Sequence, residues 1–261
     1  MLAQERQDKI LEIIQLNKIA KVSDLSQLFQ TTETTIRRDL DELQRSKKIR
    51  RVHGGAVPIK NPSKDMTDDE LSILCPEEKS MIAGSAYSYI DDHDTLFSGF
   101  FLDRFGACKT TADLRQKELF IVTNSFHVVS LLRKRLDYHL IHTGGEVKRN
   151  MACAYGSIAL KMLQNIRVDK CFLGASGIDS SFGYSDPNLN DSALKEAILK
   201  ASRLHFVLAD HTKFNESYIG KFADFKGIID YLITDSLPKS IDLSTYEESV
   251  NLILVNPIAK L

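Results

Sequence analysis

The sequence predicts an α/β protein of two parts: a small helical domain ending in a β-hairpin, and a larger domain built on a mostly parallel sheet. The 261 residues exceed the usual length of one domain. The first 57 residues hold three helical patterns followed by a basic, glycine-ended hairpin pattern. After residue 76, short apolar runs alternate with helical patterns, as in parallel sheets covered on both faces. We expect domains at 1–57 and 76–261, joined by a linker at 58–75 that is rich in charge and holds two prolines.

The composition is that of an ordinary soluble globular protein, with 43% hydrophobic and 26% charged residues. The sequence has no run of about 18 apolar residues and no apolar segment behind a basic start. We therefore expect a cytoplasmic protein. Its cysteines lie far apart without a CxxC pair, so we expect mostly small buried thiols, no metal site and no cofactor. They are Cys75, Cys108, Cys153 and Cys171.

Charge is unevenly distributed along the chain, although the net charge is only −1. Residues 1–60 carry 12 Lys or Arg against 8 Asp or Glu, whereas the remainder carries 22 against 27. A basic N-terminal part on an acidic body predicts an anionic partner for the N-terminal part.

The first two helices are expected before residue 30. Apolar residues recur at helical spacing between residues 5 and 16. Ser23 can cap the second helix, because its hydroxyl can accept a hydrogen bond from a free backbone N–H. The expected buried face of this helix is Leu25, Leu28 and Phe29.

A third helix follows after a turn of a few residues, with Thr32 as its expected cap. Its apolar stripe consists of Ile36, Leu40 and Leu43. The opposite face carries Thr34, Arg37, Arg38, Asp41 and Arg45. Two helices joined by a tight turn, the second presenting Thr and Arg near its start, are typical of a helix-turn-helix that enters the major groove. Arginine can donate to both acceptors of a guanine, and threonine can contact phosphate or a thymine methyl.

A basic β-hairpin is expected directly after the third helix. Lys47, Lys48, Arg50 and Arg51 lie on or beside its first strand, and Gly54-Gly55 permits a tight bend. A basic hairpin of this kind suits the DNA backbone, so the sequence predicts a winged helix-turn-helix. Each charge run by itself is commonly a solvated surface; the combination favours binding of double-stranded DNA.

This segment resembles the N-terminal signature of the DeoR family of bacterial repressors. The matching stretches are TETTIRRDL, from Thr32 to Leu40, and RVHGGA, from Arg51 to Ala56. Thr32 replaces the usual Ser, and Lys47 stands where the family commonly has Gly. The pattern and the resemblance together indicate ten DNA-binding residues: Ser23, Thr32, Glu33, Thr34, Thr35, Arg37, Arg38, Arg50, Arg51 and His53.

Seven buried strands are expected in the larger domain, at 95–98, 119–122, 139–142, 170–173, 205–208, 231–233 and 252–255. Helical patterns occupy 126–135, 157–165 and 191–202, and another helix should open near Pro76. Small, polar or charged loops follow four of the strands. Because parallel strands end at one edge of a sheet, these loops should meet there, where ligands of such sheets bind. Their N–H groups, hydroxyls and one ammonium suit a polyol bearing a phosphate.

The larger domain resembles the sugar-phosphate sensor domain of the same family, itself similar to ribose-5-phosphate isomerase. The resemblance and the loops indicate eleven effector-binding residues: Thr123, Asn124, Ser125, Gly144, Gly145, Gly174, Ser176, Asp191, Lys195, Asp210 and Lys213. One segment departs from the family. Gly99, Phe100, Phe101, Leu102 and Asp103 replace a loop thought to hold phosphate. The effector could accordingly be an unusual or unphosphorylated sugar derivative, or the pocket could respond to nothing.

These observations predict a DNA-binding repressor of a carbohydrate-metabolism operon, a homodimer or homotetramer that a sugar-phosphate-like effector releases from its operator. That the effector releases the repressor, and does not promote DNA binding, is implied by the resemblance alone. The alternative function, an active isomerase, belongs to a different class of protein, the enzymes. Its relatives use an Asp-Gly-Ala-Asp loop, whereas the corresponding residues here are Leu173, Gly174, Ala175 and Ser176, so we expect no enzyme activity. A constitutive architectural DNA binder would leave the large α/β domain unexplained.

Overall fold

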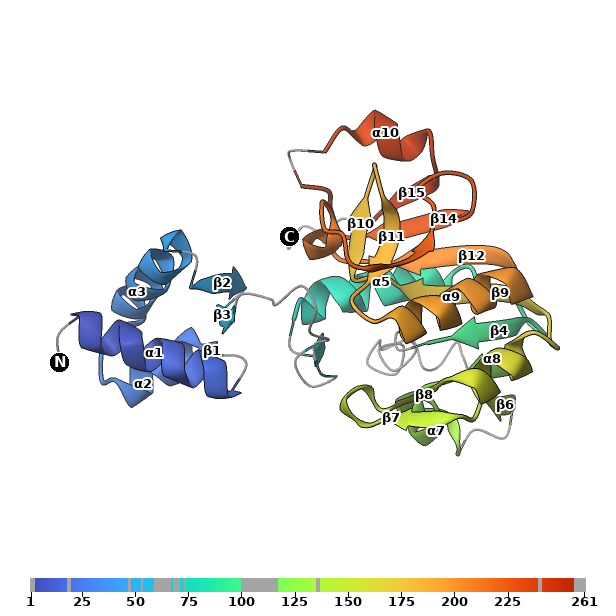
Figure 1. Cartoon of the computed structure of the whole chain (residues 1–261), viewed down its shortest axis with the longest axis horizontal. Helices are drawn as coiled ribbons and strands as arrows, with labels where there is room; N and C mark the ends of the chain where they lie inside the picture. Colours follow the sequence, from blue (N-terminus) through green and yellow to red (C-terminus); the bar gives the residue numbers. More distant parts are fainter. Residues whose placement is uncertain are drawn as a thin grey trace. The chain divides into compact units, whose positions relative to one another are not determined.

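The computed structural model describes residues 3–17, 20–46, 48–52, 54–58, 67, 71–72, 74–99, 117–134, 137–238 and 241–255. The chain divides into two compact units, residues 1–75 and 76–261 (Figure 1). The finer division into a domain at 1–57 and a linker at 58–75 stays a prediction. Among the described residues, no helix is long and apolar enough to cross a membrane.

The N-terminal unit contains three helices and a small sheet. Its elements are α1 (Ala3–Asn17), β1 (Ala20–Lys21), α2 (Val22–Leu28), α3 (Glu33–Arg45), β2 (Ile49–Val52) and β3 (Gly55–Pro58). The predicted stripe of α3 is buried, since Ile36 and Leu40 are 0% exposed and Leu43 is 2% exposed. These side chains pack with Ile10 and Ile14 of α1 in one core.

The second helix differs from the prediction in two respects. Ser23 does not cap it, because β1 pairs with β3 up to Lys21 and the helix begins at once at Val22, which makes Lys21 the N-cap. The exposed Ser23 hydroxyl instead bonds to Asp24. Leu28, expected in the core, is 64% exposed because the helix ends at this residue, and Phe29 packs against the core from the following turn.

The hairpin after α3 is confirmed. Strands β2 and β3 pair antiparallel, with Val52 opposite Gly55, so the turn contains only two residues. Gly54 in this turn has φ +78°, in the left-handed region that glycine tolerates. Gly55 has a different requirement, because a Cβ there would lie 2.2 Å from the carbonyl oxygen of Ala20. Only glycine lets β1 approach β3 this closely.

The C-terminal unit is built on a seven-stranded parallel sheet, and all seven predicted strands are confirmed. They are β4 (Thr95–Ser98), β5 (Leu119–Thr123), β6 (Tyr138–His142), β9 (Val168–Gly174), β12 (Ser202–Leu208), β14 (Tyr231–Thr234) and β15 (Asn251–Leu254). Their order is β15-β14-β12-β9-β4-β5-β6, and every neighbouring pair is parallel.

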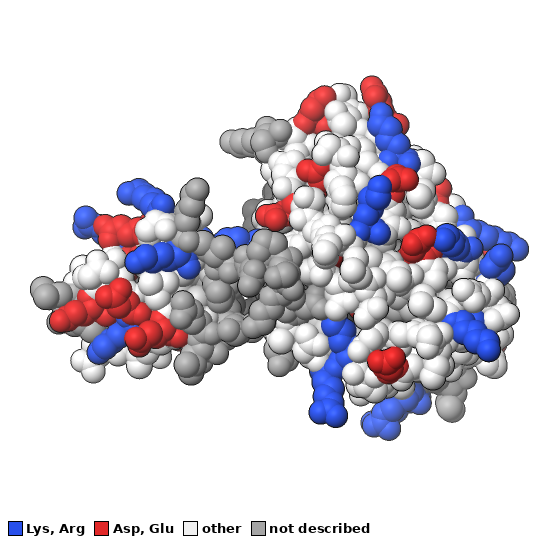
Figure 2. Space-filling model, viewed as in Figure 1, with Lys and Arg blue, Asp and Glu red and all other residues white. Residues whose placement is uncertain are grey.

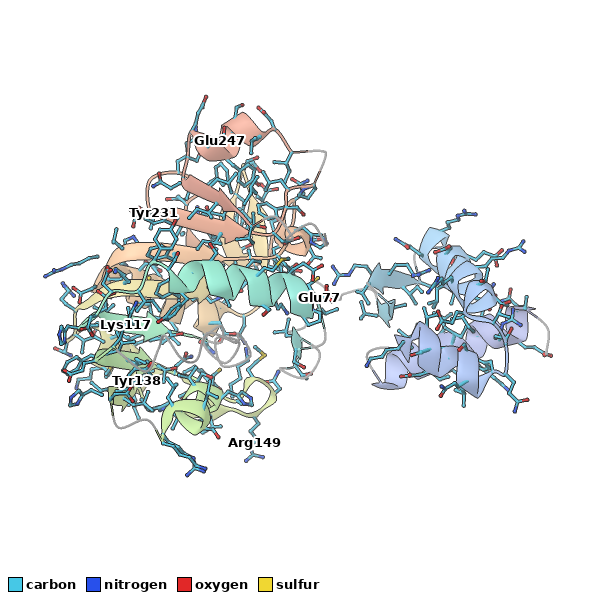
Figure 3. All side chains as sticks on the ribbon, turned by 180° about the vertical axis from the view of Figure 1, so that it is seen from behind. Glu77, Lys117, Tyr138, Arg149, Tyr231 and Glu247 are labelled. Atoms are coloured by element: carbon cyan, nitrogen blue, oxygen red, sulfur yellow. The ribbon has the colours of Figure 1, made fainter. Side chains whose placement is uncertain are left out.

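Helices cover both faces of this sheet. Helix α5 (Pro76–Tyr87) lies across one face, as Figure 3 shows, and α7 (Phe126–Leu132) contributes to the same apolar cluster. Helices α8 (Ser157–Leu163) and α9 (Leu189–Ala201) pack against the other face. Cys171 lies at 0% exposure within this second cluster, whereas Cys75 and Cys153 are half-buried.

Smaller elements follow the carboxyl ends of the strands of this sheet. They are the hairpin β7 (Glu146–Lys148) and β8 (Cys153–Tyr155), the antiparallel sheet β10 (Gly177–Asp179), β11 (Gly183–Asp186) and β13 (Gly220–Ala223), the 3-10 turns η2 (Arg149–Met151) and η3 (His211–Lys213), and α10 (Leu243–Glu247). From β4 the chain proceeds to β5 and β6 on one side, and β9 returns to the other side of β4. Such a reversal marks the usual ligand-binding edge of an open parallel sheet.

Candidate DNA interface and effector site

The recognition helix α3 is positioned by its cap and its buried stripe. The Thr32 hydroxyl accepts a hydrogen bond from the backbone N–H of Thr35 at 3.3 Å, which confirms the predicted cap. With Ile36 and Leu40 facing the core, the side chains of Thr34, Arg37 and Arg38 are exposed. The side chains on the face predicted to contact DNA are therefore not used for packing the core.

The charges on α3 differ in their pairing. Arg37 forms an exposed ion pair with Glu33 at 2.8 Å, one helical turn earlier. Arg38 has no ion pair with any described residue. Figure 2 shows basic and acidic side chains mixed on the visible face of the unit, so a uniformly basic surface does not distinguish this side.

Asp39 is a residue that sequence reasoning missed. It lies on the core side of α3 at 3% exposure and accepts two hydrogen bonds from Arg6 of α1, at 2.5 and 3.1 Å. Hydrogen bonding to Asp39 raises the pKa of Arg6 above its ordinary value. Gln7 donates to Asp39 at 3.4 Å and to Glu42 at 2.5 Å. Helix α1 thereby fixes the recognition helix through polar contacts as well as apolar ones.

The wing arginines are not equivalent. Arg51 donates to the carboxylate of Asp41 at 2.5 Å and to the carbonyl oxygen of Arg37 at 3.0 Å, so its guanidinium joins the wing to α3. Arg50 is half-buried, and it makes no ion pair with a described residue. His53 and Lys47 lie outside the described residues.

At the ends of β5 and β6, the predicted effector residues already have partners within the fold. The Thr123 hydroxyl accepts from the N–H of Ser125, whose own hydroxyl caps α7. The Asn124 side chain donates to the carbonyl of Ala154 at 3.0 Å and thereby anchors strand β8. Gly145 has φ +118°, and a Cβ there would lie 2.3 Å from a β8 carbonyl oxygen. Gly144 shares this turn, with φ +68°.

At the end of β9, a closed network includes Asp186, which sequence reasoning also missed. Asp186 is 4% exposed and accepts from the N–H and the hydroxyl of Ser176, at 3.1 and 2.7 Å. Lys195 donates to Asp186 at 2.5 Å and to the carbonyl of Gly174 at 2.6 Å. The ammonium of Lys195 is therefore neutralised inside the fold.

Asp191, at the start of α9, is paired with Lys148 at 2.5 Å. Burial raises the pKa of Asp191 above its ordinary value, although Lys148 acts in the opposite direction. This pair links the β7–β8 hairpin to α9.

At the end of β12, one carboxylate oxygen has no hydrogen-bond donor in the described part of the chain. Asp210 is 1% exposed, and its Oδ1 accepts from the N–H and hydroxyl of Thr212. Its Oδ2 accepts no hydrogen bond from a described residue and lies 3.8 Å from the ammonium of Lys213. Burial raises the pKa of Asp210, but the charges of Lys213 and Lys79 and the bond from Thr212 outweigh burial and hold it below its ordinary value. Asp210 is therefore a buried anion with an open acceptor.

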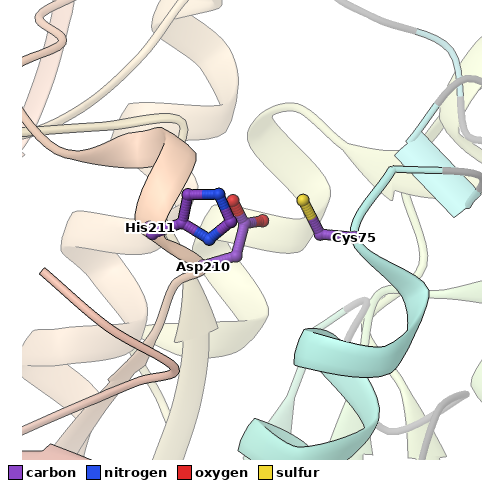
Figure 4. Close-up of side chains that lie close together, drawn as sticks. All are labelled: Cys75, Asp210 and His211. Carbon is purple, nitrogen blue, oxygen red and sulfur yellow. The ribbon is translucent and has the colours of Figure 1, made fainter. Parts of the chain in front are cut away.

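His211 and Asp235 form a further pair that sequence reasoning did not select. Asp235, 7% exposed at the end of β14, accepts from the backbone N–H of His211 at 2.8 Å and contacts its ring Nδ1 at 2.7 Å. Figure 4 shows the His211 ring beside the carboxylate of Asp210, and a ring nitrogen lies within 4.8 Å of a carboxylate oxygen. Of the departing segment 99–103, only Gly99 is described.

The capped recognition helix, the basic two-stranded wing and the separate parallel α/β unit define a winged helix-turn-helix regulator of transcription with a sensor unit. The description "DeoR-like helix-turn-helix domain" matches residues 6–61, and "DeoR C terminal sensor domain" matches residues 75–236. The chain belongs to the DeoR family of DNA-binding transcriptional regulators, as the sequence predicted.

Relatives align along nearly the whole chain. The uncharacterized HTH-type transcriptional regulator FruR of Bacillus subtilis is 30% identical over 98% of this chain and 100% of its own. YulB of the same organism, likewise named an uncharacterized regulator, is 31% identical over 100% and 99%. The glycerol-3-phosphate regulon repressor of Escherichia coli is 29% identical over 91% and 93%. A D-ribose-5-phosphate isomerase structure covers 53% of this chain and 54% of its own at a TM-score of 0.37 and 16% identity, too weak a likeness for an argument about the site.

Proposed function

We propose that this regulator is a repressor that binds operator DNA through α3 and the wing, and leaves the operator when a phosphorylated sugar or related polyol binds the sensor unit. The exposed guanidinium of Arg38, which has no ion pair with a described residue and lies opposite the buried stripe of α3, carries the DNA-binding half of this proposal. The glycerol-3-phosphate regulon repressor among the relatives supports the repressor role and the class of ligand.

The DNA contacts divide by chemistry. Arg38 and Thr34 are proposed to contact base edges, with Arg37 oriented by Glu33. Near the start of α3, backbone N–H groups favour a phosphate, which supports contacts from the Thr32 and Thr35 hydroxyls. The remaining proposed contacts are to the DNA backbone, from Ser23, Arg50, Arg51 and His53.

The effector is proposed to bind at the carboxyl end of β12. Buried polar groups in native proteins nearly always have partners, so the open acceptor of Asp210 and the neighbouring ammonium of Lys213 indicate where polar ligand atoms belong. The other predicted residues are proposed to frame the pocket, since their polar groups are occupied or they are glycines of tight turns. They are Thr123, Asn124, Ser125, Gly144, Gly145, Gly174, Ser176, Asp191 and Lys195.

We propose a homodimer or homotetramer in the cytoplasm that binds repeated half-sites spaced by helical turns, because a symmetric regulator presents paired recognition helices. A ligand that prefers the DNA-incompetent arrangement shifts the population toward it. We propose no catalytic turnover. An isomerase needs a positioned carboxylate to carry a proton, and at Ser176 a hydroxyl bound to Asp186 stands in its place.

A thermal-shift screen against sugars, sugar phosphates and sugar acids tests the sensor half. A dose-dependent rise in melting temperature is expected from the effector. Lys213→Ala should then abolish this rise and the release of DNA, while operator affinity without effector persists. Lys221→Ala is the matched control, because Lys221 is an exposed lysine of the same unit. A response that persists in Lys213→Ala contradicts the assigned role, and so does a folded, DNA-binding wild type that no compound stabilises.

A further inference from the structure

We propose that His211 contacts the effector directly, and that His211 and Asp210 together bind two neighbouring hydroxyl groups, a vicinal diol, of that ligand. The inference rests on the proposed effector role of the sensor unit and deepens it, since it names both an additional binding residue and the chemical group that this residue binds.

His211 is held rigidly by Asp235. One carboxylate oxygen of Asp235 accepts the backbone N–H of His211 at 2.8 Å, and the other lies 2.7 Å from ring Nδ1. Asp235 is itself 7% exposed and accepts a third hydrogen bond from the hydroxyl of Ser236 at 3.1 Å. A carboxylate at Nδ1 favours the tautomer that carries its proton on that nitrogen, and in this tautomer Nε2 is an acceptor. The His211 side chain is 41% exposed, so Nε2 is open to a ligand.

Asp210 supplies a second acceptor beside the first. Its Oδ2 is buried and accepts no hydrogen bond from a described residue. A carboxylate oxygen of Asp210 and a ring nitrogen of His211 lie within 4.8 Å of each other (Figure 4). The two side chains are therefore close enough to accept hydrogen bonds from two donors on adjacent carbon atoms of a polyol, since each hydroxyl can donate one hydrogen bond.

The charges around Asp210 and His211 indicate where the diol and the phosphate of the ligand should lie. Ionised Asp210 and Asp235 repel a phosphate, so the groups that contact Asp210 and His211 should be neutral donors. Lys213 is buried with its ammonium 3.8 Å from Asp210, and it supplies the positive charge for an anionic group adjoining the diol. The site accordingly suits a polyol whose phosphate lies close to a vicinal diol.

The neighbouring loops offer weaker alternatives for this contact. Lys195 and Ser176 at the end of β9 are engaged with Asp186. Asn124 at the end of β5 donates to the carbonyl of Ala154. Within the described part of this edge, the end of β12 thus combines a buried carboxylate oxygen without a donor and a half-exposed histidine fixed by a second carboxylate.

Calorimetric titration of the full-length protein tests the proposal. The probes are glycerol 3-phosphate, ribose 5-phosphate, fructose 1-phosphate, fructose 6-phosphate and inorganic phosphate, together with two analogues of the tightest binder, each lacking one hydroxyl of its diol. His211→Asn retains a donor to Asp235 but has no atom at the position of Nε2. The variant should bind the diol-bearing probe roughly tenfold more weakly, which corresponds to the loss of about one hydrogen bond. Its affinity for inorganic phosphate, and for the deoxy analogue that lacks the hydroxyl bound by His211, should stay within about twofold of wild type, because neither ligand makes the contact that the variant has lost.

His211→Gln, whose amide reaches toward the position of Nε2, should recover part of the lost affinity, which a purely structural role would not produce. Unchanged affinity of His211→Asn for the diol, with Lys213→Ala still impaired, overturns this inference and leaves the proposed effector site intact. An equal loss for the diol probe and for both deoxy analogues also overturns it. If the wild type binds DNA but none of the probes, both the inference and the effector half of the proposed function fail.

Discussion

The guanidinium of Arg6 in α1 donates two hydrogen bonds to the buried carboxylate of Asp39 in the recognition helix. Breaking a buried ion pair by removing one partner leaves an uncompensated charge in the core. Arg6→Ala should therefore destabilise the N-terminal unit by about 3–5 kcal/mol. Urea unfolding of the full-length protein measures this loss. The double variant Arg6→Ala, Asp39→Ala should recover part of the stability, and equal stability of wild type and Arg6→Ala would contradict the role of the pair.

The close approach of β1 and β3 predicts different costs at two adjacent glycines. Gly55→Ala should displace β1, because the new Cβ would lie 2.2 Å from the carbonyl oxygen of Ala20. Gly54→Ala should cost only about 1–2 kcal/mol, since a Cβ there meets nothing within 4 Å and the cost is that of a left-handed backbone. Thermal unfolding and DNA affinity of both variants distinguish the positions. A milder effect at Gly55 than at Gly54 is incompatible with this strand pairing.

The wing arginines should respond differently to salt. Arg50 is free of ion pairs among the described residues, so Arg50→Ala should reduce the slope of log affinity against log salt by about 1. Arg51 is tied to Asp41, and Arg51→Ala should reduce the slope less while weakening binding through the loss of wing position. Fluorescence anisotropy on a DNA fragment over a range of salt concentrations measures both slopes. An unchanged slope for Arg50→Ala refutes its backbone contact.

Cys171 should be chemically inert in the folded protein. Burial raises the pKa of its thiol to about 12, and the thiolate is the reactive form, so iodoacetamide at pH about 8 should leave it unmodified. Mass spectrometry after brief exposure reports the labelled cysteines, and the same reaction in urea is the control in which Cys171 becomes labelled. Rapid labelling under native conditions would mean that the sheet core around Cys171 is open.

Local patterns in the sequence were sufficient for the architecture. Apolar runs located all seven parallel strands, and Thr32 was recognised as a cap because capping involves residues only three apart. The start of α2 differs from the local prediction, because the pairing of β1 with distant β3 makes Lys21 the cap in place of Ser23.

Long-range polar pairs could not be predicted in the same way. Asp39, Asp186 and Asp235 resemble surface carboxylates in the sequence, and their burial is explained only by partners brought from other elements: Arg6, Lys195 and His211. Asp39 had a weak signal, since it adjoins Leu40 of the apolar stripe. No local spacing relates the other two to their partners.

Binding of DNA by Arg38→Ala tests the central claim most directly. The wild type and this variant are titrated against a fragment from the promoter region of the regulator's own gene, and against random DNA of equal length. Loss of a base contact predicts that the variant binds the promoter fragment about 1–3 kcal/mol more weakly, with relaxed sequence preference. Lys9→Ala, at an exposed lysine of α1 outside the predicted DNA-binding residues, is the control and should bind nearly as the wild type does. Unchanged affinity of Arg38→Ala, or an equal loss on both DNAs, would contradict the proposal that this face of α3 reads the operator.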